Sequence, residues 1–269
     1  MRFELSDMSC GYGGKPVLTD VSFSVESGDI LCILGPNGVG KTTLFKSMLG
    51  LLPALKGEVR VDGESIARWD NKRKAQVIGY IPQSHVPPFP YTVLQVVTMG
   101  TVANLGMFAS PGRDDYLRAL TALKELGVLY LRDRIYTEIS GGERQMVLIA
   151  RALAQKPKIL LMDEPTANLD YGNQARVLAQ INRLAAQGMA VVMTTHSPDH
   201  AFLCSSKVVL IERGNRISFG AARDIVTEEN LRRAYGIDVA ILEGVRNDKA
   251  IQGCVPLIDA VGASRPLDA

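Results

Sequence analysis

The sequence lacks both a long apolar run and a signal-like start. No stretch approaches the roughly 18 consecutive apolar residues that a membrane-spanning helix needs, and the opening residues Met1–Asp7 carry acidic side chains without the apolar centre of a signal peptide. We therefore expect a chain that neither crosses a membrane nor enters a secretory route by itself. Docking on a membrane protein remains open.

Cysteine is scarce and the charge is balanced. Cys10, Cys32, Cys204 and Cys254 are scattered without a C-x-x-C pair, which fits a reducing compartment better than a disulfide framework or a zinc site. The 30 basic and 28 acidic residues give a net charge of +2, which argues neither for nor against a nucleic-acid partner. The 269 residues, 46% of them apolar, suffice for one large domain or two intimate subdomains.

The N-terminal part reads as strands followed by a helix. Val21–Val25 alternates apolar and polar residues, as a half-exposed strand does. Ile30–Leu34 is a continuous apolar run, which is typical of a strand buried on both faces. From Lys41 the apolar residues recur at helical spacing until Gly50 ends the helix. Gly57–Ile66 then resembles a hairpin.

The rest of the chain alternates between helical spacing and strand-like apolar runs. Residues 84–155 have helical spacing and no strand signal, and the end of the chain, from Thr227, has a short helix pattern and then little periodicity. Elsewhere we predict strands at Val77–Ile81, Ile159–Met162, Ala190–Thr194 and Val208–Ile211 and a helix at Gln174–Gln187. Strands that alternate with helices indicate a mainly parallel sheet.

A glycine-rich loop carries the strongest chemical signal. Gly35–Thr42 matches G-x-x-x-x-G-K-[ST] at every fixed position, between a buried strand and a helix. Glycines let successive N–H groups point at phosphate oxygens, and the helix N-terminus adds a partial positive charge. We expect Lys41 to contact the β- and γ-phosphates of ATP and Thr42 to offer its hydroxyl to Mg²⁺. The nucleotide-binding residues expected here are Gly35, Pro36, Asn37, Gly38, Val39, Gly40, Lys41, Thr42 and Thr43.

Two carboxylates follow the apolar run Ile159–Met162. We expect Asp163 to hold Mg²⁺, directly or through water, and Glu164 to polarise the water that attacks the γ-phosphate. Such a pair alone could be simple surface polarity. The phosphate loop upstream makes it a candidate metal and base pair.

The ordered set of motifs resembles the ATP-binding subunits of ABC transporters over about residues 3–220. Ile139–Glu143 resembles the family signature, usually L-S-G-G-Q, and Arg144–Leu153 continues the signature helix. Asp163–Asp170 resembles the Walker B and D-loop run. Three single residues complete the resemblance: Gln83 as the Q-loop glutamine, His196 as the switch histidine and Tyr12 as the aromatic that stacks on adenine.

The resemblance implies a head-to-tail homodimer that hydrolyses ATP. Each ATP would lie between the phosphate loop of one subunit and the signature of the other, with Glu164 as base, His196 bracing the γ-phosphate, and Gln83 coupling Mg²⁺ to the helical part. The second copy would contribute Ser140, Gly141 and Gly142, and Tyr12, Glu143 and Asp170 are further nucleotide-binding residues that the resemblance implies. Glu143 replaces the usual glutamine and places an acid near the phosphates, which leaves open how tightly that end contacts nucleotide.

The resemblance also implies the fold class. We expect an α/β fold with a P-loop NTPase core, a mostly parallel sheet, an N-terminal antiparallel β subdomain and an inserted α-helical subdomain. The expected parts are 1–83 and 156–226 for the ATP-binding core, 84–155 for the inserted subdomain and 227–269 for a C-terminal extension.

Two segments, Pro90–Gly100 and Glu229–Ile237, resemble the subgroup serving importers of metal chelates: iron-siderophore, haem, cobalamin or, in some members, molybdate or tungstate. This implies a multi-span permease resting around Ser84–Met107, an external substrate-binding protein acting indirectly, and a place on the cytoplasmic membrane face. Two alternatives are a soluble ABC-type ATPase acting on DNA or ribosomes and a regulatory module without turnover. The single cassette without a basic tail disfavours the first, so no nucleic acid is expected, and Glu164 with His196 disfavours the second.

Overall fold

A six-stranded sheet forms the centre of the computed structural model, which describes residues 1–83, 89–105, 109–246 and 248–258. The strand order is β10-β9-β3-β8-β7-β6; all neighbours pair in parallel except β10, which runs antiparallel to β9. The strands are β3 (Ile30–Leu34), β6 (Ile78–Ile81), β7 (Ile159–Met162), β8 (Ala190–Thr195), β9 (Lys207–Glu212) and β10 (Arg216–Ala221).

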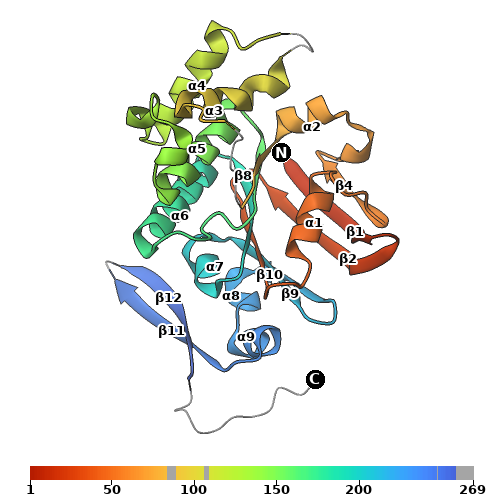
Figure 1. Cartoon of the computed structure of the whole chain (residues 1–269). Coiled ribbons are helices and arrows are strands. Elements are labelled where there is room, and N and C mark those ends of the chain that lie inside the picture. Colours follow the sequence, from red (N-terminus) through yellow and green to blue (C-terminus); the bar gives the residue numbers. More distant parts are fainter. Residues whose placement is uncertain (84–88, 106–108, 247, 259–269) are drawn as a thin grey trace.

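A second, antiparallel sheet of four strands in the order β2-β1-β4-β5 lies beside the central one (Figure 1). Its strands are β1 (Arg2–Tyr12), β2 (Lys15–Glu26), β4 (Lys56–Val61) and β5 (Glu64–Ser65). The β4–β5 hairpin turns at Asp62 and Gly63, both with positive φ (50° and 83°), which is the geometry that an Asp-Gly turn favours. The predicted hairpin is therefore confirmed.

The central strands are buried on both faces, and alternate residues enter different cores. In β3, Leu31 and Ile33 pack with the antiparallel sheet and α1 (Lys41–Met48), whereas Ile30, Cys32 and Leu34 pack with the helices on the opposite face. This alternation follows from the two-residue period of a strand. A continuous apolar run is required because neither face meets water.

Helices fill the upper region of Figure 1, where α3, α4 and α5 pack against one another. This region comprises α3 (Val93–Thr98), α4 (Arg113–Glu125) and α5 (Gly141–Ala154), with the 3₁₀ turns η2 (Met99–Asn104), η3 (Leu129–Leu131) and η4 (Tyr136–Glu138). The other helices are η1 (Ile66–Arg68), α2 (Asn71–Val77), α6 (Tyr171–Ala186), α7 (Pro198–Cys204), α8 (Ala222–Ile225) and α9 (Glu228–Tyr235).

The end of the chain departs from the sequence expectation. After α9 a hairpin of β11 (Val239–Arg246) and β12 (Lys249–Pro256) packs against α7, although the sequence there has little periodicity and no strand was expected. Most of β11 is exposed, and without a buried face a strand carries no clear alternation of apolar and polar residues. Gly244 and Gly253 interrupt the apolar residues further.

Other boundaries shift slightly. Val77 is the last residue of α2 and not the first of a strand, and α6 begins at Tyr171, three residues before the expected Gln174, because Asp170 caps it. Strand β10 and helices α2, α7 and α8 were not expected. The mostly parallel α/β fold class is confirmed, while the domain boundaries stay a prediction. Within the described ranges, no helix combines the length and the apolar character needed to cross a bilayer.

We expect Gly100→Ala to destabilise the helical region. A Cβ at Gly100 would lie 1.9 Å from the carbonyl oxygen of Arg151 on α5, so η2 and α5 would have to separate. Such overpacking costs about 1–3 kcal/mol, measurable as a lower urea midpoint. Gly112→Ala is the matched control, because its Cβ would meet its nearest neighbour, Asp115 Oδ2, only at 4.0 Å. Equal midpoints for both variants would contradict the close contact.

Candidate functional site

The loop between β3 and α1 needs its glycines for two separate reasons. Gly38 and Gly40 have φ values of 84° and 108°, in the left-handed region that glycine enters without strain. Gly35 has no such backbone, but a Cβ there would lie 2.5 Å from the carbonyl oxygen of Ile211 at the end of β9. The first turn of α1 carries no acidic residue, so the positive end of this helix is available to an anion.

Lys41 is held inside this loop. Its side chain is only 6% exposed, and Nζ donates to the carbonyl oxygens of Gly35 at 2.8 Å and Pro36 at 3.0 Å. Burial lowers the pKa of Lys41, while the nearby carboxylates of Glu164 and Asp163 act in the opposite direction. The loop therefore presents a buried ammonium group together with backbone N–H groups, a combination suited to phosphate.

A pocket of about 510 Å³ opens beside the loop. It is lined by Val17, Asn37, Gly38, Gly40, Lys41, Thr42, Thr43, Gln83 and Glu164. Most of these residues are the expected nucleotide-binding ones. Gln83 and Glu164 come from the ends of two other strands, β6 and β7. The pocket thus lies at the carboxyl edge of the parallel sheet, where open α/β folds bind their ligands.

The hydroxyl of Thr194 joins the two acidic residues after β7. It donates to Asp163 Oδ1 at 2.7 Å and accepts from the backbone N–H of Glu164 at 2.8 Å. Thr194 is fully buried and Asp163 is 7% exposed. Burial raises the pKa of Asp163, and the hydrogen bond from Thr194 opposes that rise.

Glu164 lies among three predicted site residues. Its Oε2 accepts from Gln83 Nε2 at 3.0 Å and lies 3.6 Å from His196 Nδ1, while Oε1 lies 3.8 Å from Lys41 Nζ. Glu164 has φ 46°, a left-handed conformation that a non-glycine residue rarely adopts. Such strain concentrates at functional positions, and the hydrogen bond from its N–H to Thr194 stabilises it here.

The signature residues form the start of α5. Ser140 caps the helix: its Oγ accepts from the Glu143 N–H at 3.3 Å, and Glu143 Oε2 accepts from the Ser140 N–H at 2.9 Å. Tyr130 Oη donates to Glu143 Oε1 at 3.0 Å. Hydrogen bonds from the Ser140 hydroxyl and N–H lower the pKa of Glu143. The acid that replaces the usual glutamine is therefore an ionised helix cap.

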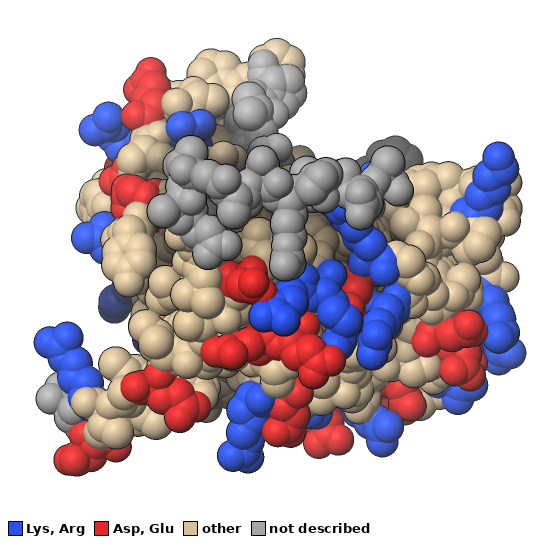
Figure 2. Space-filling view, turned by 90° about the horizontal axis from the view of Figure 1, so that it is seen from below, with Lys and Arg blue, Asp and Glu red and all other residues tan. Residues whose placement is uncertain are grey.

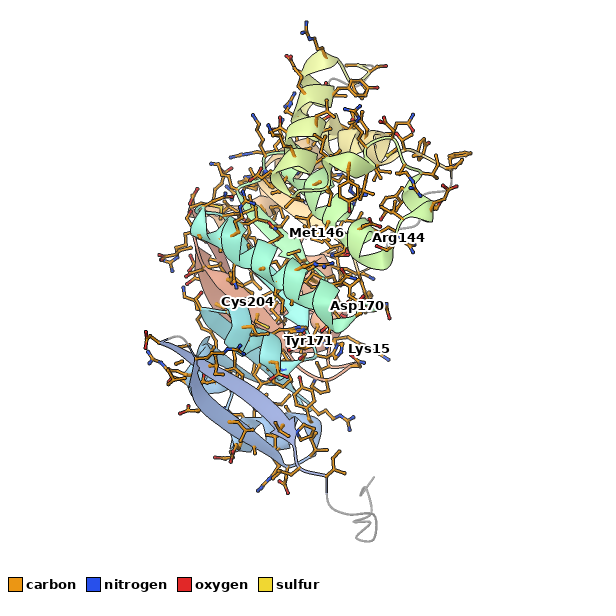
Figure 3. All side chains as sticks on the ribbon, turned by 90° about the vertical axis from the view of Figure 1, so that its left-hand side faces the viewer. Lys15, Arg144, Met146, Asp170, Tyr171 and Cys204 are labelled. Carbon is orange, nitrogen blue, oxygen red and sulfur yellow. The ribbon has the colours of Figure 1, made fainter. Side chains whose placement is uncertain are left out.

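The D-loop aspartate is linked to the signature through Asn173. Asp170 caps α6 by accepting from the Asn173 N–H at 2.8 Å and from its Nδ2 at 2.7 Å. A Cβ at Gly142 would lie 2.4 Å from Asn173 Cγ, so the amide packs directly on the signature glycine. Figure 3 shows Arg144, near the start of α5, and Asp170 on the same side of the molecule.

The structure brings together only part of the predicted set. The residues of the phosphate loop, Gln83, Asp163, Glu164 and His196 converge at one site. The signature residues and Asp170 do not line the pocket, and neither does Tyr12, which is 50% exposed near the end of β1. The roles of all these residues stay predictions. Sequence reasoning did not predict Thr194 or Asn173 as site residues. The only signal for Thr194 was its position at the end of a strand, and the only signal for Asn173 was its position after a helix cap.

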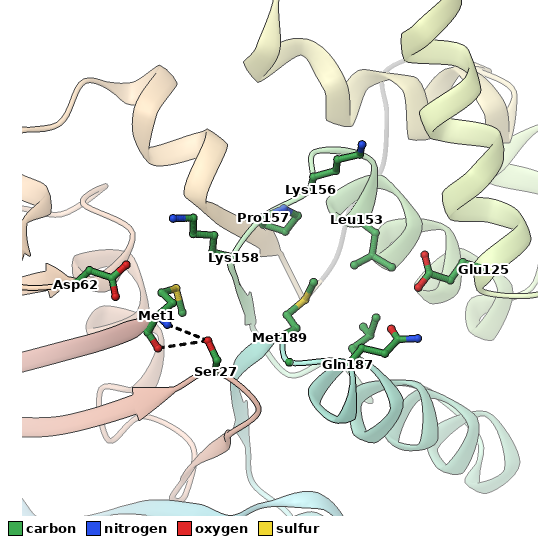
Figure 4. Close-up of a pocket in the computed structure, with 12 residues that line it drawn as sticks. Met1, Ser27, Asp62, Glu125, Leu153, Lys156, Pro157, Lys158, Gln187 and Met189 are labelled. Carbon is green, nitrogen blue, oxygen red and sulfur yellow. Dashed lines mark hydrogen bonds between the residues drawn. The ribbon is translucent and has the colours of Figure 1, made fainter.

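A second pocket, of about 580 Å³, lies at the opposite edge of the sheet (Figure 4). Its lining includes Ser27, Lys158 and Met189, which precede strands β3, β7 and β8 at their amino ends. Met1 also lines it and donates its terminal amine to Ser27 Oγ at 3.1 Å. No predicted site residue lines this pocket.

Oxygen donors suited to Mg²⁺ meet at the first pocket. The Thr42 hydroxyl lines it and the Asp163 carboxylate lies next to it. The amide NH₂ of Gln83 is bound to Glu164, which leaves the amide oxygen to meet a cation. These are the hard ligands that Mg²⁺ prefers, and Mg²⁺ usually takes few protein ligands beside substrate phosphates. The described part of the chain has no cluster of three or more His, Cys, Asp or Glu residues that could hold a metal ion.

Comparisons with known proteins identify the family. A family model described as ABC transporter matches residues 18–167. An uncharacterized ABC transporter ATP-binding protein of Haemophilus influenzae is 40% identical, with 87% of this chain and 89% of that protein covered. The molybdate import ATP-binding protein MolC of the same organism is 37% identical, with 88% of each covered.

A solved structure described as a metal-chelate type ABC transporter in an inward-facing conformation has a TM-score of 0.86 at 34% identity, covering 95% of this chain and 97% of that chain. The chain therefore belongs to the ABC transporter family as one of its ATP-binding subunits, which are ATPases. The resemblance seen in the motifs is confirmed.

We expect Thr194→Val to keep the fold but weaken turnover. The valine retains the shape and removes the donor to Asp163 and the acceptor for the Glu164 N–H. Leaving these buried groups unpaired costs about 1–3 kcal/mol of stability, and misplacing Glu164 slows ATP hydrolysis by about ten-fold. Thermal melting and steady-state phosphate release measure the two effects. Thr121→Val, at an exposed threonine on α4, should change neither.

Proposed function

We propose that this chain hydrolyses ATP with Glu164 as the general base. The observation that carries the proposal is the position of its carboxylate, at a phosphate-loop pocket and within 4 Å of Lys41, Gln83 and His196. Lys41 and the loop N–H groups bind and orient the phosphates. Glu164 accepts the proton of the attacking water, and His196 holds that carboxylate and the γ-phosphate end in place. Mg²⁺, held by Thr42, Asp163 and Gln83, would supply charge neutralisation at the phosphates.

The complete site requires a second copy of the chain. Ser140, Gly141 and Gly142 lie at the N-terminus of the fourteen-residue helix α5, away from the pocket of their own chain. Free N–H groups at a helix N-terminus suit the γ-phosphate of a facing subunit. Two chains arranged head to tail would thus close around two ATP molecules, and loss of the γ-phosphate would release them.

Contacts within the chain account for an acid at position 143. Its carboxylate is turned back to the Ser140 N–H and hydroxyl and to Tyr130 Oη. In this position it compensates the helix N-terminus instead of facing the incoming phosphate.

We further propose that the ATPase powers import of a metal chelate or molybdate-type oxyanion through a partner permease, as a peripheral subunit on the cytoplasmic membrane face. A molybdate import protein and a metal-chelate type transporter are among the relatives that cover nearly the whole chain, and zinc and manganese transport proteins widen the range. The permease would rest around Ser84–Met107, of which residues 84–88 and 106–107 lie outside the described part. An external substrate-binding protein would deliver the cargo.

The rival, an ABC-type ATPase acting on DNA or ribosomes, needs a surface that attracts phosphates. On the face seen in Figure 2, lysine and arginine side chains are interspersed with aspartate and glutamate. Such a mixture gives no broad positive field. This face therefore gives no support to a nucleic-acid partner, and the net charge of +2 argues neither way.

We expect Glu164→Gln to bind ATP but to lose about 100-fold or more of its turnover, because the amide cannot accept the water's proton. The trapped ATP should hold two chains together, so the variant should elute as a dimer in size-exclusion chromatography with ATP and as a monomer without it. Glu125→Gln, at the opposite pocket, should behave as the parent. Full hydrolysis by Glu164→Gln would remove Glu164 from the role of base.

We expect the tagged chain to co-purify with a multi-span permease from detergent-solubilised membranes of its own cells. Mass spectrometry of the eluate identifies the partner, and reconstitution of the pair in vesicles should give ATP-dependent uptake of a metal chelate or molybdate. Recovery of ribosomes or DNA in place of a permease would favour the rival function.

A further inference from the structure

The C-terminal extension reaches the catalytic region through one side chain. Tyr235, the last residue of α9, donates its hydroxyl to the backbone carbonyl oxygen of His196 at 3.0 Å. His196 in turn places Nδ1 3.6 Å from Glu164 Oε2. Tyr235, from the C-terminal extension, thus contacts the backbone of the histidine that lies beside Glu164.

Helix α9 is a firm support for this contact. Leu231 and Ala234 are 0% and 3% exposed and belong to the core on the helical face of the sheet. Arg233 Nε donates to Glu212 Oε2 at 3.2 Å, and Glu212, at the end of β9, is 4% exposed. The Arg233 side chain is 29% exposed, but loss of this partner would leave the buried Glu212 carboxylate without it, which is costly. The pair therefore fixes α9, and with it Tyr235, relative to the central sheet.

The Tyr235 hydroxyl is a donor at this position. Burial raises the pKa of Tyr235, and a backbone hydrogen bond involving Gly35 opposes that rise. The phenol therefore stays protonated and donates to the His196 carbonyl oxygen.

A second attachment holds the segment after His196. Asp199 in α7 accepts with Oδ1 from the backbone N–H of Cys254 in β12 at 2.8 Å. The hairpin and α9 thus contact the His196–Asp199 segment from two separate elements. The side chain of His196 is itself 56% exposed, so its direction depends on how its backbone is held.

We infer that Tyr235 is a positioning residue for ATP hydrolysis: its hydroxyl fixes the backbone of His196 and thereby keeps the imidazole beside Glu164. The inference rests on the role proposed above for His196. It gives the C-terminal extension a part in the reaction, since α9 carries the group that holds the histidine in place.

Kinetics of the full-length chain test the inference. Tyr235→Phe keeps the ring and removes the donor, so kcat should fall about five-fold with ATP binding and melting temperature near the parent values. In a His196→Ala background, Tyr235→Phe should cause no further loss in single-turnover phosphate release, because both changes act on one group. Tyr116→Phe, at an exposed tyrosine on α4, is the matched control.

Spectroscopy tests the contact independently of activity. His196-Ser197 is the single His-Ser pair among the three histidines of the sequence. Labelling with [1-¹³C]histidine and [¹⁵N]serine therefore selects the His196 carbonyl alone in an NMR spectrum. Tyr235→Phe should shift this carbonyl signal upfield, as expected when a hydrogen-bond donor is removed, whereas Tyr116→Phe should leave it in place.

The outcomes separate the two claims. Parent-like kcat in Tyr235→Phe, an equal loss in the parent and His196→Ala backgrounds, or an unmoved carbonyl signal would each overturn the inference. Full turnover in His196→Ala would instead overturn the proposed role of His196, whatever Tyr235 does. Slow turnover in His196→Ala with parent-like Tyr235→Phe would leave the proposed function standing and remove only the positioning role.

Discussion

Burial of the parallel strands on both faces is the constraint on which the structure depends. Because β3, β7 and β8 contribute alternate residues to two cores, each strand is fixed in register and height. Their carboxyl ends then meet at one edge. Each of the three strands leads directly into a part of the site. The phosphate loop follows β3, the acidic pair follows β7 and His196 follows β8. The geometry of the site is thus a consequence of where the core ends.

At that edge, polar groups emerge from an apolar interior, and each needs a partner. Thr194 satisfies Asp163 and the strained backbone of Glu164 together. The Lys41 ammonium is held by two loop carbonyls. These contacts hold the Lys41 ammonium and the Glu164 carboxylate 3.8 Å apart, on side chains only 6% and 16% exposed, which strengthens their mutual effect. A site built in this way is organised before any ligand arrives.

Sequence reasoning predicted most of the central fold because the buried strands have an unmistakable pattern. Ile30–Leu34 and Ile159–Met162 were located to the residue, and the loop motif identified the anion site. It failed where burial is one-sided or slight, as in β11, and where a helix start depends on a single cap such as Asp170. Thr194 could not be predicted as a bridge, because only the pairing of β7 with β8 brings it beside Asp163.

The contact between Gly142 and Asn173 has a mechanical consequence. With 2.4 Å between a Cβ at position 142 and Asn173 Cγ, the starts of α5 and α6 touch without room for even a methyl group. The same amide is bound to Asp170 and receives a hydrogen bond from Arg176 Nη1 at 3.2 Å. A rotation of the helical region therefore has two possible outcomes. Either the D-loop moves with it as one rigid body, or the contact between Gly142 and Asn173 is lost.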